Sequence, residues 1–137
     1  MTYDEAFEQL VSDGTIQRPP KDAVFEFVDA VLDRQPERVF ELCAECKKSK
    51  EPVLIMLSVL YNNIRAVLQV QTCGSSNVER ATGLTAWQVR NARKHLHKYT
   101  DLELENALAL LSKCSRGLKI GILDEAVAVE YVLVHVL

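Results

Sequence analysis

The feature that most restricts the fold of this sequence is the helical spacing of its apolar residues, which continues from Lys21 to the C-terminus. Apolar residues three and four positions apart lie on one face of a helix. Pro36 fits the first position of a second helix, because its missing amide proton is not needed there. Pro52 opens a third helix, which runs to about Thr72 and is ended by Gly74. The pattern predicts a series of packed helices.

Capping boxes predict where further helices start. In such a box a Ser or Thr side chain and a Glu or Gln side chain three positions later satisfy free backbone amides at the helix N-terminus. The three boxes are Ser76 with Glu79, Thr85 with Gln88, and Thr100 with Glu103. Gly83 fits a helix end between the first two. We therefore expect three more helices after the third.

The C-terminal segment 123–137 is rich in valine, which favours strands. Its apolar residues nevertheless keep a helical period, and the sequence offers no second strand with which it could pair. We predict a helix here. The fold class is then all-α, a compact bundle of about six or seven helices.

Residues 1–20 are only weakly connected to this pattern. Tyr3, Phe7 and Leu10 have helical spacing, and Pro19 and Pro20 follow in a linker-like stretch. We expect an N-terminal segment over 1–20, which is the end of a preceding region or a linker. One helical domain should cover 21–137, and the chain should be a fragment of a longer protein.

Composition narrows the class of protein. The chain of 137 residues, 48% hydrophobic and 26% charged, suits one soluble globular domain. A net charge of −3 is unlike the basic excess of a dedicated nucleic-acid binder. The N-terminus is polar and acidic, so no signal peptide is predicted. The longest apolar stretches, 53–60 and 126–137, are too short to cross a bilayer. A cytoplasmic protein is expected.

Cys43 and Cys46 form a C-x-x-C pair that invites a redox or metal interpretation. A redox pair takes its low thiol pKa from a helix N-terminus, whereas this pair lies in the middle of a predicted helix. A zinc site would need Cys73 and Cys114 to converge on it. Free cysteine behaves as a small hydrophobic residue, so we predict reduced cysteines in the core.

The sequence contains no pattern typical of an active site. His95 and His97 are two apart on a helix and point in different directions, and all three histidines are expected at or near the surface. Phosphate-binding glycine loops, G-x-S-x-G and H-E-x-x-H are absent. We predict no catalytic residue, no cofactor and no metal site.

Residues 84–98 support an alternative function, a small helix-turn-helix-like regulator that binds DNA. Two short capped helices meet near Gly83, and the second carries a run of basic residues. These are Arg90, Arg93, Lys94 and Lys98. The competing interpretation is a packed helical hairpin with a basic outer face, which the acidic whole chain favours. In that hairpin the residues facing inward would be Trp87, Val89, Ala92 and Leu96.

Taken in order, the segments from Lys21 onward resemble the C-terminal region of the delta subunit of the bacterial DNA polymerase III clamp loader. The resemblance is carried by the Phe-rich start at 23–43, the Pro-started long helix at 48–71, the Gly turn with its basic and Leu-rich helices at 81–111, and the end at 115–137 with Lys119 and Gly121. The family often has an acidic residue one turn before this lysine. Here Ser115 occupies that place, so an ion pair expected there is absent.

The resemblance implies an AAA+-associated collar domain without enzymatic activity in a parent protein that is part of the polymerase III holoenzyme. Residues 1–20 would then end a lid-like region. The domain would pack with the tau or gamma and delta-prime collar domains into a pentameric collar. The sliding clamp and primed DNA would be contacted only through the absent N-terminal region and the whole assembly, and no membrane is involved. Arg90, Arg93, Lys94, Lys98 and Lys119 are the candidate interface or basic surface residues.

Overall fold

The computed structural model describes residues 21–137, and the segment expected over 1–20 lies outside the described residues. Within 21–137 the chain forms seven helices and no strand, as predicted for an all-α bundle. Their bounds are α2 Lys21–Leu32, α3 Pro36–Lys48, α4 Val53–Thr72, α5 Val78–Thr82, α6 Ala86–Arg93, α7 Asp101–Lys119 and α8 Glu125–Val136.

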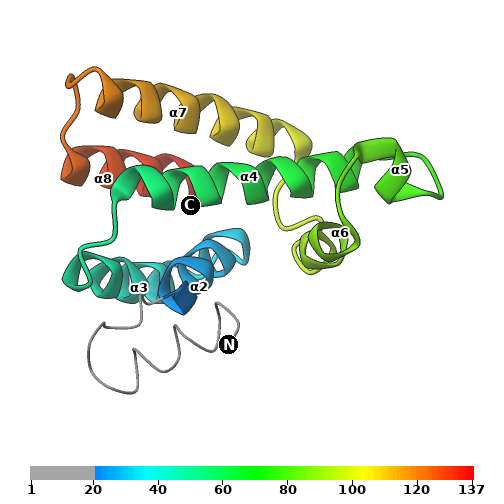
Figure 1. The fold of residues 1–137 in the computed structure, drawn as a ribbon, viewed down its shortest axis with the longest axis horizontal. Helices are drawn as coiled ribbons and strands as arrows, with labels where there is room; N and C mark the ends of the chain where they lie inside the picture. The colour runs from blue at the N-terminus through cyan, green and yellow to red at the C-terminus, as the bar shows by residue number, and fades with distance from the viewer. Residues whose placement is uncertain (1–20) are drawn as a thin grey trace, which may run out of the picture.

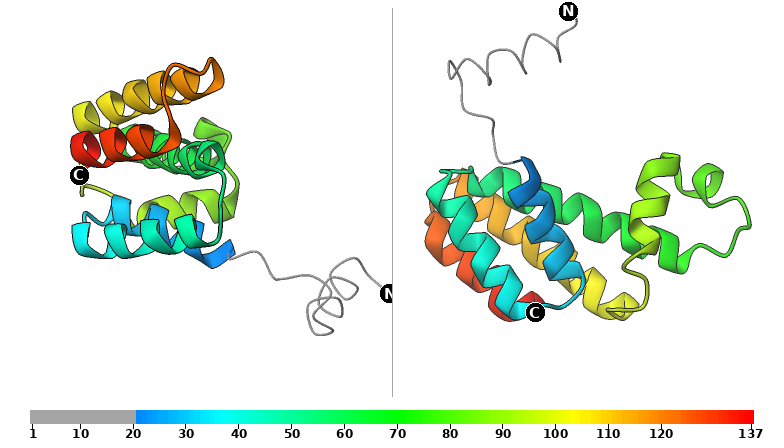
Figure 2. Two further views of the ribbon diagram at one scale, coloured as in Figure 1. Left: turned by 90° about the vertical axis from the view of Figure 1, so that its left-hand side faces the viewer. Right: turned by 90° about the horizontal axis from the view of Figure 1, so that it is seen from below.

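The helices are arranged in layers around α4. The α2–α3 hairpin forms one outer layer and α7 the other, with α4 and α8 between them (Figures 1 and 2). The helices α5 and α6 lie at the far end of α4, where its C-terminus is (Figure 1). The helix α4 packs against α2, α5, α6 and α7, so it has neighbours on several sides.

The central position of α4 explains its apolar sequence. The apolar stretch at 53–60 continues in a helix of 20 residues with mean hydropathy 1.5, which by length and composition alone could cross a membrane. This helix of 20 residues is longer than the apolar stretch 53–60, which by itself was judged too short to cross a bilayer. The same composition is required of a helix that packs on several sides in a bundle core, and Leu57, Leu60 and Ile64 are fully buried there. The contacts of α4 with four other helices favour this second explanation.

Two of the three predicted capping boxes are confirmed and one is wrong. Thr85 and Thr100 each accept a bond from the backbone amide three positions on, and the reciprocal side-chain bonds are present. At α5 the cap is Asn77, whose Oδ1 accepts the Arg80 amide at 3.2 Å, so the predicted pair of Ser76 with Glu79 does not form. Both residue types suit this position, and the helix starts one residue later than predicted.

The valine-rich C-terminal segment is helical, as predicted. Asp124 caps α8 by accepting the Val127 amide at 2.9 Å. The preceding turn is built on Gly117 of α7, whose carbonyl accepts the amides of Ile122 and Leu123. The Leu123 side chain lies directly over Gly117, so this close approach sets where α8 begins.

A polar cluster holds the loop between α6 and α7 against α2. The His95 ring places Nδ1 2.7 Å from Asp33 Oδ1 and Nε2 3.1 Å from Asp29 Oδ1. The Tyr99 hydroxyl donates to the carbonyl of Val31 at 2.6 Å, and Arg34 stacks over the Tyr99 ring. His95 is only 4% exposed, so the prediction of a surface histidine is wrong at this position. The cause is long-range: the two aspartates are more than 60 residues away in sequence.

Candidate interaction surfaces

The outer face of α8 is apolar and exposed. Val127, Tyr131 and Val134 recur at helical spacing and are each about half exposed or more, with Val134 at 72%. The opposite face, with Ala128, Val132 and Val136, is buried in the bundle. A helix that is apolar on all sides normally has neighbours on all sides. Within the described chain, α8 is covered on one side only.

The other long apolar stretch of the sequence, at 53–60, is mostly used in the core. Val53, Met56, Leu57 and Leu60 are buried, and Ile55 is the large apolar residue of this stretch that is exposed. The central place of α4 accounts for the difference, because a helix with neighbours on several sides buries its own apolar residues. The unpartnered apolar surface of the two stretches is therefore concentrated on α8.

A second exposed surface lies on α6. Val89 and Ala92 face inward as predicted and Leu96 is half-buried, but Trp87 is 57% exposed, so its predicted inward position is wrong. Val89 and Ala92 follow Trp87 by two and five residues, which puts their buried face roughly 140–200° around the helix from Trp87. Periodicity therefore gives the reason for the exposed indole.

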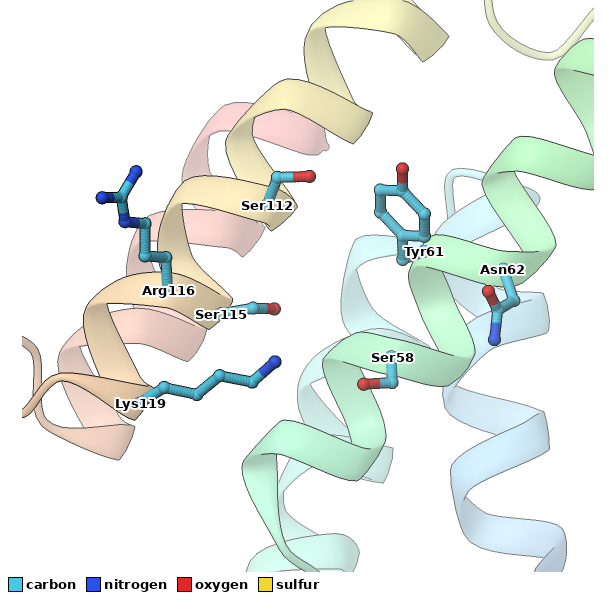
Figure 3. A pocket seen from close by; sticks show the side chains of 7 residues that line it. All are labelled: Ser58, Tyr61, Asn62, Ser112, Ser115, Arg116 and Lys119. Carbon is cyan, nitrogen blue, oxygen red and sulfur yellow. The ribbon is translucent and has the colours of Figure 1, made fainter.

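The basic residues predicted as a surface are not all on one face. Arg90, Arg93 and Lys94 are exposed on or next to α6, and Arg90 lies on the same side as Trp87. Lys98 lies in the following loop, with Nζ 4.0 Å from Asp33 Oδ1 in the turn after α2. Lys119 is far from α6, at the C-terminal end of α7 (Figures 1 and 3). The structure thus brings together three of the five predicted residues.

Lys119 belongs to a groove of about 470 Å³ between α4 and α7. The two helices run in opposite directions there, and the Lys119, Ser112 and Ser115 side chains extend from α7 toward α4 (Figures 1 and 3). The residues that line the groove are Ser58, Tyr61, Asn62, Ser112, Ser115, Arg116 and Lys119. Lys119 was predicted as a surface residue, whereas its neighbours on α4 could not be predicted, because only the fold brings α4 beside α7.

The cysteines lie in apolar surroundings. Cys46 and Cys114 are buried, as predicted for core residues, while Cys43 and Cys73 are only half-buried. Burial raises the pKa of the Cys46 thiol to about 11, and it also raises the pKa of Cys43 and Cys114. A raised thiol pKa is the opposite of what a redox-active C-x-x-C requires. Among the described residues, no three His, Cys, Asp or Glu side chains are close enough together to hold a metal ion.

Sequence comparison then places the chain among known proteins. The family model described as DNA polymerase III delta subunit, C-terminal domain, matches residues 21–136. The chain belongs to this family. No protein with a curated description matches the sequence.

A solved structure agrees with the family at the level of the fold. The delta domain is similar to the Bacillus subtilis DNA clamp loader delta protein, with a TM-score of 0.71 and 18% identical residues. The similar region covers 83% of this chain but only 35% of that protein. The described bundle therefore has the fold of about a third of the Bacillus protein.

Proposed function

We propose that this chain is the subunit-assembly module of a clamp-loader delta subunit, which packs beside the C-terminal domains of the other loader subunits in the collar. Membership of the delta C-terminal family supports this role, and so does the unpartnered apolar face of α8. The function is mechanical: it holds the subunits in register while their other domains act on the clamp. In this proposal residues 21–137 are the collar domain, residues 1–20 end the preceding region, and the domain itself has no enzymatic activity.

The observation that carries the proposal is the geometry of α8. Val127, Tyr131 and Val134 lie on one side of a single helix, so they form a continuous strip and not scattered apolar residues. Tyr131 also stacks against His135, with ring centroids 4.2 Å apart, which adds aromatic surface to the strip. Buried aromatic side chains contribute much of the affinity in protein interfaces. The partners proposed are the tau or gamma and delta-prime subunits.

The first test is competition. The chain is mixed with the other loader subunits before full-length delta is added, and clamp loading on primed DNA is measured. Complexes that contain this domain lack the clamp-opening region, so the loading rate should fall as the concentration of the chain rises. An interface of standard size, about 800 Å² per partner, can support competition at micromolar concentrations. A well-folded chain that neither co-elutes with those subunits nor slows loading would refute the proposal.

Two neighbouring valines provide matched variants for this test. Val134→Asp places a charge on the exposed strip, so it should keep the helicity and melting temperature while it abolishes competition. Val132→Asp places the same charge at a position that is 1% exposed, so it should unfold the domain. Circular dichroism distinguishes the two outcomes. Undiminished competition by a folded Val134→Asp variant would show that α8 is not the interface.

The exposed surface of α6 supports a second candidate function, a direct contact with DNA. Arg90 follows Trp87 by one turn and Lys94 follows it by two turns. All three therefore lie on the same exposed side of α6. Base stacking on an exposed aromatic ring combined with phosphate contacts from basic residues is a common means of binding DNA ends and single strands. The comparisons give no support for a sequence-specific regulator, so this contact would be independent of sequence.

Trp87 is the one tryptophan of the chain, so its fluorescence reports directly on this surface. Titration with a DNA that carries a duplex–single-strand junction should quench the fluorescence, and added salt should weaken the binding. Arg90→Ala with Lys94→Ala should reduce the affinity, while Lys113→Ala on α7 should not. Unchanged fluorescence at low salt would remove this candidate without affecting the assembly role.

A further inference from the structure

The α4–α7 groove has a composition that neither proposed function uses. All of its lining side chains are polar or charged, and none of them is a carboxylate. Hydroxyl groups come from Ser58 and Tyr61 on one side and from Ser112 and Ser115 on the other (Figure 3). Such groups can all donate a hydrogen bond to an oxygen acceptor.

The two cations of the groove have no acidic partner. Lys119 extends across from α7 toward α4, whereas the Arg116 side chain points away from α4 (Figure 3). Neither forms an ion pair with another residue of the described chain, although Arg34 in the α2–α3 turn and Arg38 on α3 do. The Lys119 ammonium, which lies beside neutral donors and has no acidic partner among the described residues, creates a local preference for a bound anion.

Exposed isoleucines accompany these charges. Ile55 precedes Ser58 by one turn on the same side of α4, and it is about half exposed. Ile120 follows Lys119 directly and is more than half exposed. The N-terminus of α4 and the C-terminus of α7 lie at the same end of the molecule, so the apolar residues and the lysine share that end (Figure 1).

We propose that the α4–α7 groove binds an acidic segment of a partner protein, with a carboxylate at Lys119 and apolar side chains against the isoleucines. A nucleic-acid backbone would satisfy the cations but would leave Ile55 and Ile120 against charged phosphates. A peptide with alternating acidic and apolar residues satisfies both. Tyrosine and arginine, both present in the groove, are among the residues most enriched at the centres of protein interfaces. This site includes no residue of the α8 strip.

The probe for the experiment is a short fluorescein-labelled peptide of alternating aspartate and leucine, and its anisotropy is followed as the whole chain is added. Binding with a Kd tighter than about 1 mM is expected. Hydrogen bonds to charged groups are each worth about tenfold in affinity, so Lys119→Glu should weaken binding by at least about tenfold. Lys113→Glu is the matched control: it makes the same charge change at an exposed position of α7 outside the groove, and should change the Kd less than about twofold.

Three further probes complete the test. The same peptide with asparagine in place of aspartate should bind at least about tenfold more weakly, and so should a peptide with serine in place of leucine. A polythymidylate oligonucleotide of equal charge is the third probe. It should show no binding that is lost in the Lys119→Glu variant. No binding of the aspartate–leucine peptide, equal loss with both lysine variants, or tighter binding of the oligonucleotide at Lys119 would each overturn the proposal.

Discussion

Replacement of Gly117 by alanine tests whether the α7–α8 turn is fixed by close packing. A Cβ at this position would lie 2.8 Å from Leu123 Cδ1 and 3.0 Å from Leu123 Cγ. Overpacking of this kind costs about 1–3 kcal/mol, because the leucine must move. Alanine in place of glycine in a helix also contributes about 1 kcal/mol of stability. The free energy of unfolding should therefore fall by about 0–2 kcal/mol.

The two opposing effects are separated in a second background. Leu123→Ala removes both of the atoms that the new Cβ would meet. In that variant Gly117→Ala should raise the free energy of unfolding by about 1 kcal/mol, because only the helix propensity remains. The same substitution thus changes sign between the two backgrounds, and the coupling between the two positions should be about 1–3 kcal/mol.

The assay is equilibrium urea unfolding, followed by circular dichroism, of the wild-type chain, both single variants and the double variant. Equal slopes with respect to urea in all four proteins would show that the compactness of the unfolded state is unchanged. If Gly117→Ala has the same effect in both backgrounds, Leu123 does not lie over Gly117. The account of how the turn positions α8 would then be wrong.

Further predictions concern the other surfaces and the core. Trp87→Ala should change the free energy of unfolding by no more than about 0.5 kcal/mol, because the indole is exposed; a larger loss in urea unfolding would mean that it packs inward. His95→Ala should cost about 1–3 kcal/mol in the same assay, because it removes a buried ring and its bonds to Asp29 and Asp33, and a neutral result would contradict the polar cluster. Burial raises the pKa of Cys46 from 9.0 to about 11, so the folded state keeps a proton that the unfolded chain loses. The free energy of unfolding should fall as the pH rises from about 9 to about 11, and a fall just as steep in Cys46→Ala would exclude this thiol as a cause.

Features set by local chemistry could be predicted from the sequence. The boxes at Thr85 and Thr100 and the glycine that ends α5 act within a few residues, and all three are found. The C-terminal helix was predicted against the strand preference of valine, since its apolar period matched a helix and no partner strand was available. The all-α fold class follows from the same reasoning.

Features that depend on the arrangement of the helices could not be predicted. His95 is buried because α2 brings two aspartates to it, and the sequence between them gives no sign of this contact. The groove around Lys119 is made by two helices that meet only in the folded chain. The exposure of Trp87 could be predicted in principle, because its spacing to Val89 and Ala92 places it opposite the buried face of α6. The prediction that Trp87 faces inward relied on its aromatic character and not on its position in the helix.

The most direct test of the assembly role is the composition of the complex that this chain forms. Native mass spectrometry of the chain mixed with the other loader subunits should show assemblies that contain a single copy of it. Full-length delta, added afterwards, should displace the chain and never appear together with it in one assembly, because both require the same place in the collar. An assembly that contains the chain and full-length delta together, or no assembly that contains the chain, would contradict the account.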